Sequence, residues 1–280
     1  MFKYLYDKTA DLARYVSTEH KDTHNVSFEQ AKKTISSPNT ILTNEEVLAL
    51  HPFTGSDTHP RIAVASEKTD PVFFAKHLED FFSGKTTIKD RSGNTLTAKD
   101  IDVLYIITKH DGLPMRKILS IQKPKIIHFS ITTLGNTKYE PGVMKWQDMI
   151  ERVGSFIKQG LDPNMVTLRV DPIVPGVTKI NEVDALIKRA SEFGIKNVRF
   201  SVMDYYRTTS IFMKNLGYNY EEHGYVKNSN GEFYTHAKPE VIKGISEKML
   251  QIANKYGVKL STCAEPGAIP GISKQGCLSV

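Results

Sequence analysis

The chain has 280 residues, of which 40% are hydrophobic and 24% are charged, a composition typical of a soluble globular protein and not of a disordered or fibrous one. Its 37 Lys and Arg against 31 Asp and Glu give a formal net charge of +6, which is compatible with a polyanionic partner and equally with plain solubility. We expect no membrane span and no export signal, and the two cysteines, Cys263 and Cys277, indicate a reduced, cytoplasmic setting.

Residues 1–60 are polar and weakly periodic. Their histidines, which include His20, His24, His51 and His59, are irregularly spaced, so solvated loop residues are a better interpretation than a metal site. We therefore predict an irregular N-terminal appendage over residues 1–60 and one α/β domain over residues 61–280.

From residue 61, apolar runs of strand length alternate with helical segments, the pattern of a parallel sheet built from βα units. Strands are predicted at 62–65, 102–107, 125–131, 165–170, 197–202 and 258–262. Helices are predicted at 71–82, after Pro114, and at 145–158, 181–193 and 239–256, with a small hairpin over 86–97 and a loop with a hairpin before the last helix. Six repeats predict a (β/α)6-type partial TIM barrel. An open doubly wound sheet is the alternative, because periodicity does not show closure.

The most informative stretch runs from Leu168 to Gly176, where an apolar strand meets a charged pair and two prolines. Alternate residues of a strand point to the same side, so Arg169 and Asp171 are expected to face the same way. We expect the strand ladder to stop at this pair, because proline lacks an amide donor. In isolation, the pair is most simply a structural ion pair at a strand end.

All six predicted strands end in polar side chains, and the carboxyl ends of barrel strands are where active sites form. We therefore predict a ligand site there. Its candidate residues are Ser66, Lys68, Asp70, Lys109, Ser130, Arg169, Asp171, Ser201, Asp204, Cys263 and Glu265. Asp70 and Asp204 have helix capping as an alternative role, and Cys263 has the role of a buried apolar residue.

Other polar residues have weaker functional interpretations. His128 lies within a predicted strand and is interpreted as a hydrogen-bonded core histidine. Arg207 and the tyrosines between residues 218 and 234 could contact and stack on a nucleic acid, although half-buried tyrosines are common. Because no phosphate loop, metal-ligand spacing or nucleophile motif occurs, the catalytic residues stay unassigned and no metal site is predicted.

Five runs stand in a characteristic order over roughly residues 61–277. They are Ser66-Glu67-Lys68-Thr69-Asp70, Ile107-Thr108-Lys109-His110, Arg169-Val170-Asp171-Pro172-Ile173, Phe200-Ser201-Val202-Met203-Asp204 and Thr262-Cys263-Ala264-Glu265. Together they resemble an uncharacterised bacterial and phage family, a domain of unknown function in the radical S-adenosylmethionine group near the spore photoproduct lyases. The resemblance implies S-adenosylmethionine and a [4Fe–4S] cluster as cofactors. It also implies that Lys68, Lys109 and Arg169 contact anionic groups while Asp171, Asp204 and Glu265 orient other ligand groups.

The sequence departs from that family in two places. Glu67 and Lys68 replace two arginines of its first motif, and no C-terminal cysteine triplet follows before Val280; such a triplet would hold a cluster with one iron open. The sequence is therefore either shorter than the full protein or a cluster-free relative.

Two functions follow from these patterns. The first is a radical S-adenosylmethionine-like barrel of unknown substrate, with a small molecule or a nucleic acid as candidates, incomplete for catalysis as given. The second is a cluster-free barrel that binds nucleic acid or phosphate. Hydrolysis by an Asp, Glu or His group with a divalent metal is the least supported alternative.

Overall fold

The computed structural model describes residues 62–66, 71–89, 95–101, 103–110, 112–123, 125–203, 207–227, 234–263 and 269–275. The expected appendage, with its histidines, lies outside these residues, so its separation from the barrel stays a prediction. Within the described residues, no helix has both the length and the hydropathy that crossing a membrane requires.

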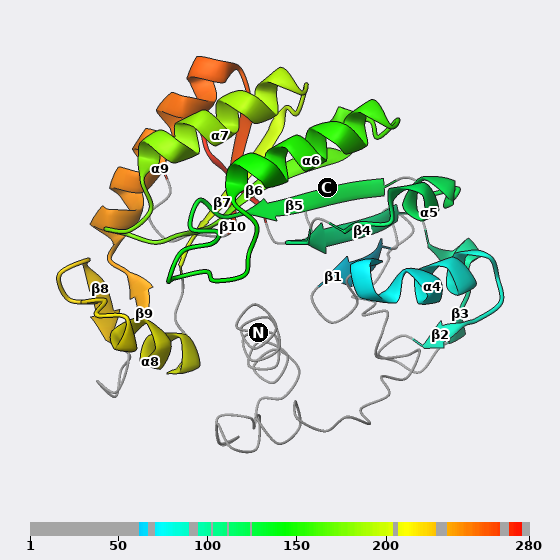
Figure 1. The fold of residues 1–280 in the computed structure, drawn as a ribbon, viewed down its shortest axis with the longest axis horizontal. Helices are drawn as coiled ribbons and strands as arrows, with labels where there is room; N and C mark the ends of the chain where they lie inside the picture. The colour runs from blue at the N-terminus through cyan, green and yellow to red at the C-terminus, as the bar shows by residue number, and fades with distance from the viewer. Residues whose placement is uncertain are drawn as a thin grey trace.

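Seven parallel strands form the main sheet (Figure 1). In spatial order they are β1 (Ile62–Ser66), β4 (Val103–Thr108), β5 (Lys125–Ile131), β6 (Val166–Ile173), β7 (Asn197–Val202), β10 (Lys259–Cys263) and β11 (Ser273–Gln275). The first six follow one another in space in the order of the chain. This arrangement is the predicted barrel-type succession of βα units, and it excludes the order reversal of a doubly wound sheet.

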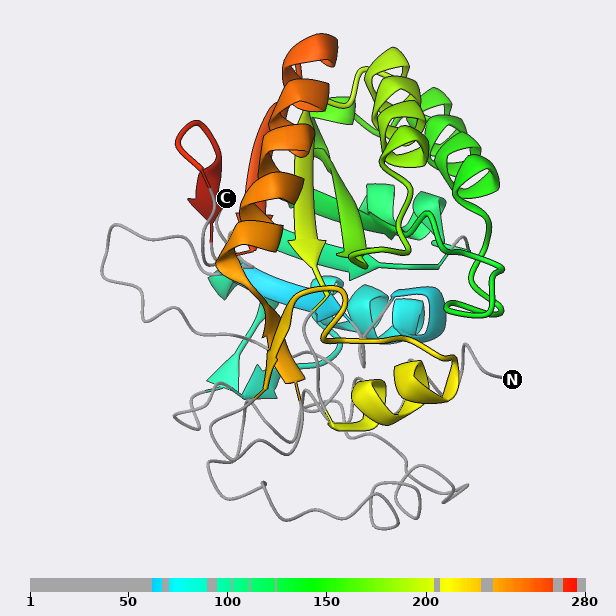
Figure 2. The same cartoon turned by 90° about the vertical axis from the view of Figure 1, so that its left-hand side faces the viewer.

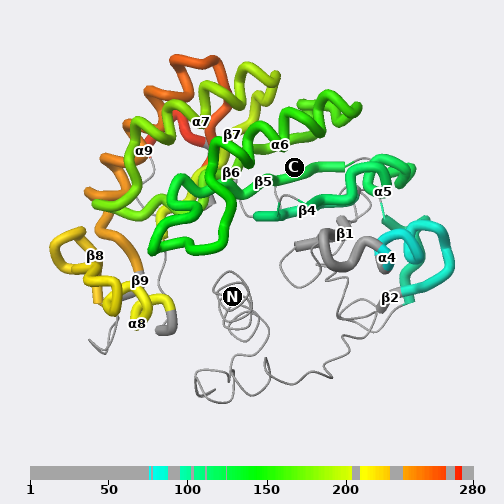
Figure 3. The backbone as a smooth tube through the Cα atoms, viewed as in Figure 1, coloured from blue at the N-terminus to red at the C-terminus, as the bar shows by residue number. Residues whose placement is uncertain are grey.

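The connecting helices follow the outer side of the curve that the strands make (Figures 1 and 3). They are α4 (Pro71–Phe82), α5 (Met115–Ser120), α6 (Trp146–Lys158), α7 (Ile180–Glu192) and α9 (Pro239–Tyr256). Short 3-10 turns, η3 (Ala98–Asp100) and η4 (Pro163–Met165), precede β4 and β6, and β2 (Ile88–Lys89) pairs with β3 (Thr95–Leu96) in the predicted first hairpin. All of these elements lie within two residues of their predicted positions or in connections left open.

The insert between β7 and α9 differs from the prediction. It contains the expected hairpin of β8 (Tyr225–Lys227) and β9 (Tyr234–Ala237), but also a helix, α8 (Arg207–Asn215). Its first turn is rich in threonine and serine, which have low helix propensity, so the local signal is weak. Phe212 and Met213 line a small apolar gap together with Pro172 and Val174 of the β6 end, and we attribute the stability of α8 to this packing.

The expectation that the ladder stops at Arg169 and Asp171 is wrong. Strand β6 continues to Ile173, and its pairing with β7 passes from Val170–Phe200 to Ile173–Val202. Strand β6 therefore advances three residues while β7 advances two, which is a bulge. Because Pro172 lies inside this irregular step, its missing amide donor costs the ladder little, and the strand resumes beyond it.

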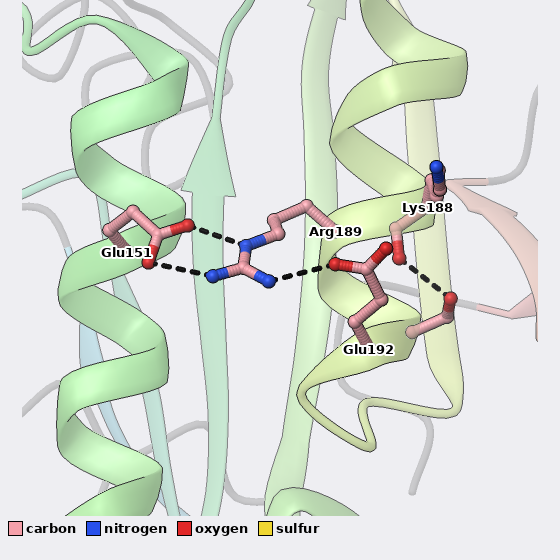
Figure 4. A network of polar contacts seen from close by, with 5 residues as sticks. Glu151, Lys188, Arg189 and Glu192 are labelled. Carbon is pink, nitrogen blue, oxygen red and sulfur yellow. Dashed lines mark hydrogen bonds and ion pairs between the residues drawn. The ribbon is translucent and has the colours of Figure 1, made fainter.

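Exposed ion pairs connect the helices on the outer side (Figure 4). Arg189 of α7 donates to both carboxylate oxygens of Glu151 on α6, and its Nη1 donates to Glu192 Oε2 at 2.8 Å. Lys255 of α9 pairs with Asp184 of α7 at 3.0 Å. Such surface pairs each contribute about 0–1 kcal/mol, so the apolar core beneath them holds the helices in place.

Candidate functional site

Side chains of the central strands alternate between two environments. On β5, Ile127, Phe129 and Ile131 are buried, and Phe129 stacks on Phe156 of α6 with ring centroids 5.9 Å apart. These residues therefore face the helices. Because successive side chains of a strand point to opposite sides, His128 and Ser130 face the inner side of the curve.

A row of polar residues crosses this inner side. The register places Ser130 of β5 opposite Arg169 of β6, Arg169 opposite Arg199 of β7, and Arg199 opposite Ser261 of β10. Since partners in parallel strands share a face, two guanidiniums stand between two hydroxyls along one line. Ser130 and Arg199 are both buried, so the row lies inside the molecule.

Arg169 and Asp171 form the ion pair that the spacing predicted. Arg169 Nη2 lies 3.2 Å from Asp171 Oδ2, and the two side chains are 12% and 9% exposed. They come from one strand and the same face, as the alternation requires. The pair extends the polar row toward the carboxyl end of β6.

Arg199 is a site residue that the sequence reasoning missed. It is only 2% exposed, and its Nε donates to Ser261 Oγ at 3.3 Å. A signal was present, because Arg199 has the same parity on β7 as the predicted Ser201 and the opposite parity to the buried Val198 and Phe200. A charged residue at an inward position of a buried strand should have been counted.

His128 lies on the inner side beside these arginines. It is buried and hydrogen-bonded, as predicted: its Nε2 lies 2.7 Å from the hydroxyl of Tyr105 on β4. Burial lowers the pKa of His128 to about 2, and the charges of Arg199 and Arg169 lower it further in the same direction. The imidazole is therefore neutral at physiological pH, and the field around it is positive.

A second charged contact lies at the end of β4. Lys109 follows that strand directly, and its Nζ lies 3.5 Å from Oε1 of Glu140. Glu140 belongs to the connection between β5 and α6, and its side chain is 4% exposed. The sequence reasoning did not select Glu140, because no periodicity indicates which loop residue folds back under a strand end.

The other predicted site residues are only partly described. Ser201 lies on β7 two residues beyond Arg199 and is half-buried. Ser66 and Cys263 end β1 and β10, but their side chains lie outside the described residues. Lys68, Asp70, Asp204 and Glu265 lie outside them altogether. The structure thus brings Lys109, Ser130, Arg169, Asp171 and Ser201 to the inner side or the carboxyl edge of one sheet.

The tyrosines of the insert do not form a stacking surface, and that interpretation is wrong for Tyr218, Tyr220 and Tyr225. All three are buried, with centroids 4.9 to 6.3 Å apart. The Tyr218 hydroxyl donates to Pro175 O at 2.8 Å, and that of Tyr225 donates to Met203 O at 3.3 Å. They attach the insert to the carboxyl ends of β6 and β7 (Figure 2). The side chains of Arg207 and Tyr234 lie outside the described residues.

Comparisons with known proteins identify the fold and the family. No curated protein matches the chain significantly. A solved structure of spore photoproduct lyase, a cysteine-to-serine mutant, matches with a TM-score of 0.52 and 12% sequence identity. The match covers 74% of this chain and 62% of that one, and at this identity it shows a shared fold. In the described residues, no three His, Cys, Asp or Glu side chains gather as a metal site would require. The predicted resemblance is confirmed, since residues 62–280 match the domain of unknown function (DUF1848), and the chain belongs to that family.

Proposed function

We propose that the barrel binds a small zwitterionic ligand on its inner face, and that this ligand is S-adenosylmethionine. The Arg169–Asp171 pair is the observation that carries the proposal. A guanidinium suits a carboxylate and a carboxylate suits an ammonium, and the amino-acid end of S-adenosylmethionine carries both groups. The likeness of the fold to spore photoproduct lyase supports the same choice.

Energetics favour a binding role for this pair over a structural one. Removing two charges from water costs free energy that their attraction often fails to recover, so a buried ion pair is a poor device for stability. Arg169 and Asp171 are largely buried within a strand whose other face packs apolar side chains. Ser130 and Ser201 add hydroxyls on the same side, and Lys109 adds a cation at the edge.

The cofactors implied by this fold fit the chain unequally. Arg169, Asp171 and Ser130 would hold S-adenosylmethionine, which supplies an electrophilic sulfonium centre when bound. The [4Fe–4S] cluster requires three thiolates to leave one iron open, whereas this sequence has Cys263 and Cys277 alone. The cysteines of this sequence therefore do not fit the cluster, and the proposal is confined to ligand binding.

Isothermal titration calorimetry with S-adenosylmethionine tests the proposal. We expect saturable binding by the wild type and at least a tenfold weaker affinity in Arg169→Gln and in Asp171→Asn, because a hydrogen bond to a charged group contributes roughly 1.5–3 kcal/mol. Arg189→Gln is the matched control, since it removes an ion-paired arginine from the outer side. Circular dichroism establishes that each variant is folded. Absence of binding by the wild type, or equal affinity in all variants, would overturn the proposal.

A cluster-free barrel that binds nucleic acid is the second candidate, and the net charge of +6 favours it. Contacts to phosphates release counterions, so log affinity falls linearly with log salt concentration. A fluorescently labelled single-stranded oligonucleotide titrated at several salt concentrations would test this candidate. Binding that is undetectable or independent of salt would remove it.

A further inference from the structure

The inner face holds one cation that the proposed function does not use. Arg199 lies directly opposite Arg169 in the register of β6 and β7, and neighbouring strands run about 4.8 Å apart. Both side chains start from the same face of the sheet, and Arg199 is almost completely buried. Two guanidiniums are thus brought side by side in the interior of the barrel.

Like charges directly opposite each other across a sheet are unfavourable, so this arrangement requires compensation. Asp171 offsets part of the charge of Arg169. The partner described for Arg199 is the neutral hydroxyl of Ser261. The positive field extends to His128, whose pKa both arginines help to lower. A region of this kind attracts anions, because the surrounding protein screens charge far less than water does.

We infer that Arg169 and Arg199 together bind one doubly charged oxyanion, the phosphate monoester group of a second ligand. Planar guanidiniums match phosphate oxygens in a bidentate way, and two of them one strand apart can contact one tetrahedral group. Ser130 and Ser261 flank the arginines in the same row and add hydroxyl donors. The inference rests on the proposed function, because it takes the inner face as the ligand site. S-adenosylmethionine carries no phosphate, so the phosphate belongs to the substrate.

Calorimetric titration of the full chain with three probes tests the inference: inorganic phosphate, adenosine monophosphate and adenosine. We expect adenosine monophosphate to bind at least tenfold more tightly than adenosine. Binding of inorganic phosphate as tightly as the monophosphate would identify the free anion as the ligand and overturn the monoester inference. Equal affinity for adenosine and its monophosphate would overturn it as well.

Variants separate the inference from the proposed function. Arg199→Gln should weaken adenosine monophosphate at least tenfold and leave the affinity for S-adenosylmethionine within twofold of the wild type, whereas Arg189→Gln should change neither. Ser261→Ala, which removes the hydroxyl that accepts from Arg199, should weaken the monophosphate severalfold and serves if Arg199→Gln does not fold. Phosphate affinity that survives both Arg199→Gln and Ser261→Ala would overturn the inference. Loss of S-adenosylmethionine binding alone would instead count against the proposed function.

Discussion

The two faces of the main sheet use the same chemical groups for different ends. On the outer side, Arg189 joins Glu151 and Glu192, with side chains 39%, 54% and 44% exposed. On the inner side, Arg169 joins Asp171 where both are nearly buried. Water screens the outer contacts, while the inner pair lies in a medium where each charge interacts more strongly. Stability resides in the apolar residues under the helices, and the inner face retains charges that a purely structural wall would not need.

The largest expected effect comes from two neighbours on β5. Phe129→Ala on the outer side should lower the free energy of unfolding by roughly 3–5 kcal/mol, because it leaves a cavity against Phe156. Ser130→Ala on the inner side should cost less than about 1.5 kcal/mol. Urea denaturation followed by circular dichroism measures both. If Ser130→Ala proved as destabilising as Phe129→Ala, the inner face would have to be regarded as structural core.

An intermediate effect is expected from acidification. The folded pKa of His128, about 2, lies below its ordinary value of 6.5, so between these values the unfolded chain binds a proton that the folded chain excludes. Stability from this group is therefore complete above pH 6.5 and is lost as the pH falls, by about 1.4 kcal/mol per unit.

Between pH 7 and pH 4.5 the wild type should thus lose roughly 2–3 kcal/mol more than His128→Gln, which cannot titrate. Denaturant midpoints measured at several pH values for both proteins provide the comparison. Parallel pH profiles would contradict a buried neutral imidazole at this position.

The smallest effects come from two double-mutant cycles. The coupling free energy between Arg169 and Asp171, from Arg169→Gln, Asp171→Asn and the double variant, should be roughly 1.5–3 kcal/mol. The corresponding cycle for Arg189 and Glu151 should give less than about 1 kcal/mol. Raising the salt concentration should reduce the outer coupling more than the inner one, since buried pairs are screened less. Equal couplings with equal salt dependence would remove the distinction between the faces.

Much of the fold follows from local patterns. The bounds of β5, β7 and α9 agree with the predicted ranges, because period-two and helical periodicity are properties of adjacent residues. Gly257 ends α9 in the left-handed conformation expected of a C-cap glycine. Elements with weak local signals were missed: α8 depends on packing against the end of β6, and β11 is a three-residue strand defined by its pairing with β10.

For the candidate site, the sequence alone determined that Arg169 and Asp171 share a face, since they are alternate residues of one strand. It also determined the family through its ordered motifs. Only the tertiary structure placed Arg199 beside Arg169, His128 against Tyr105 and Glu140 beneath Lys109. These contacts join residues far apart in the chain, and they depend on strand order and register, which are set by burying the outer face against the helices.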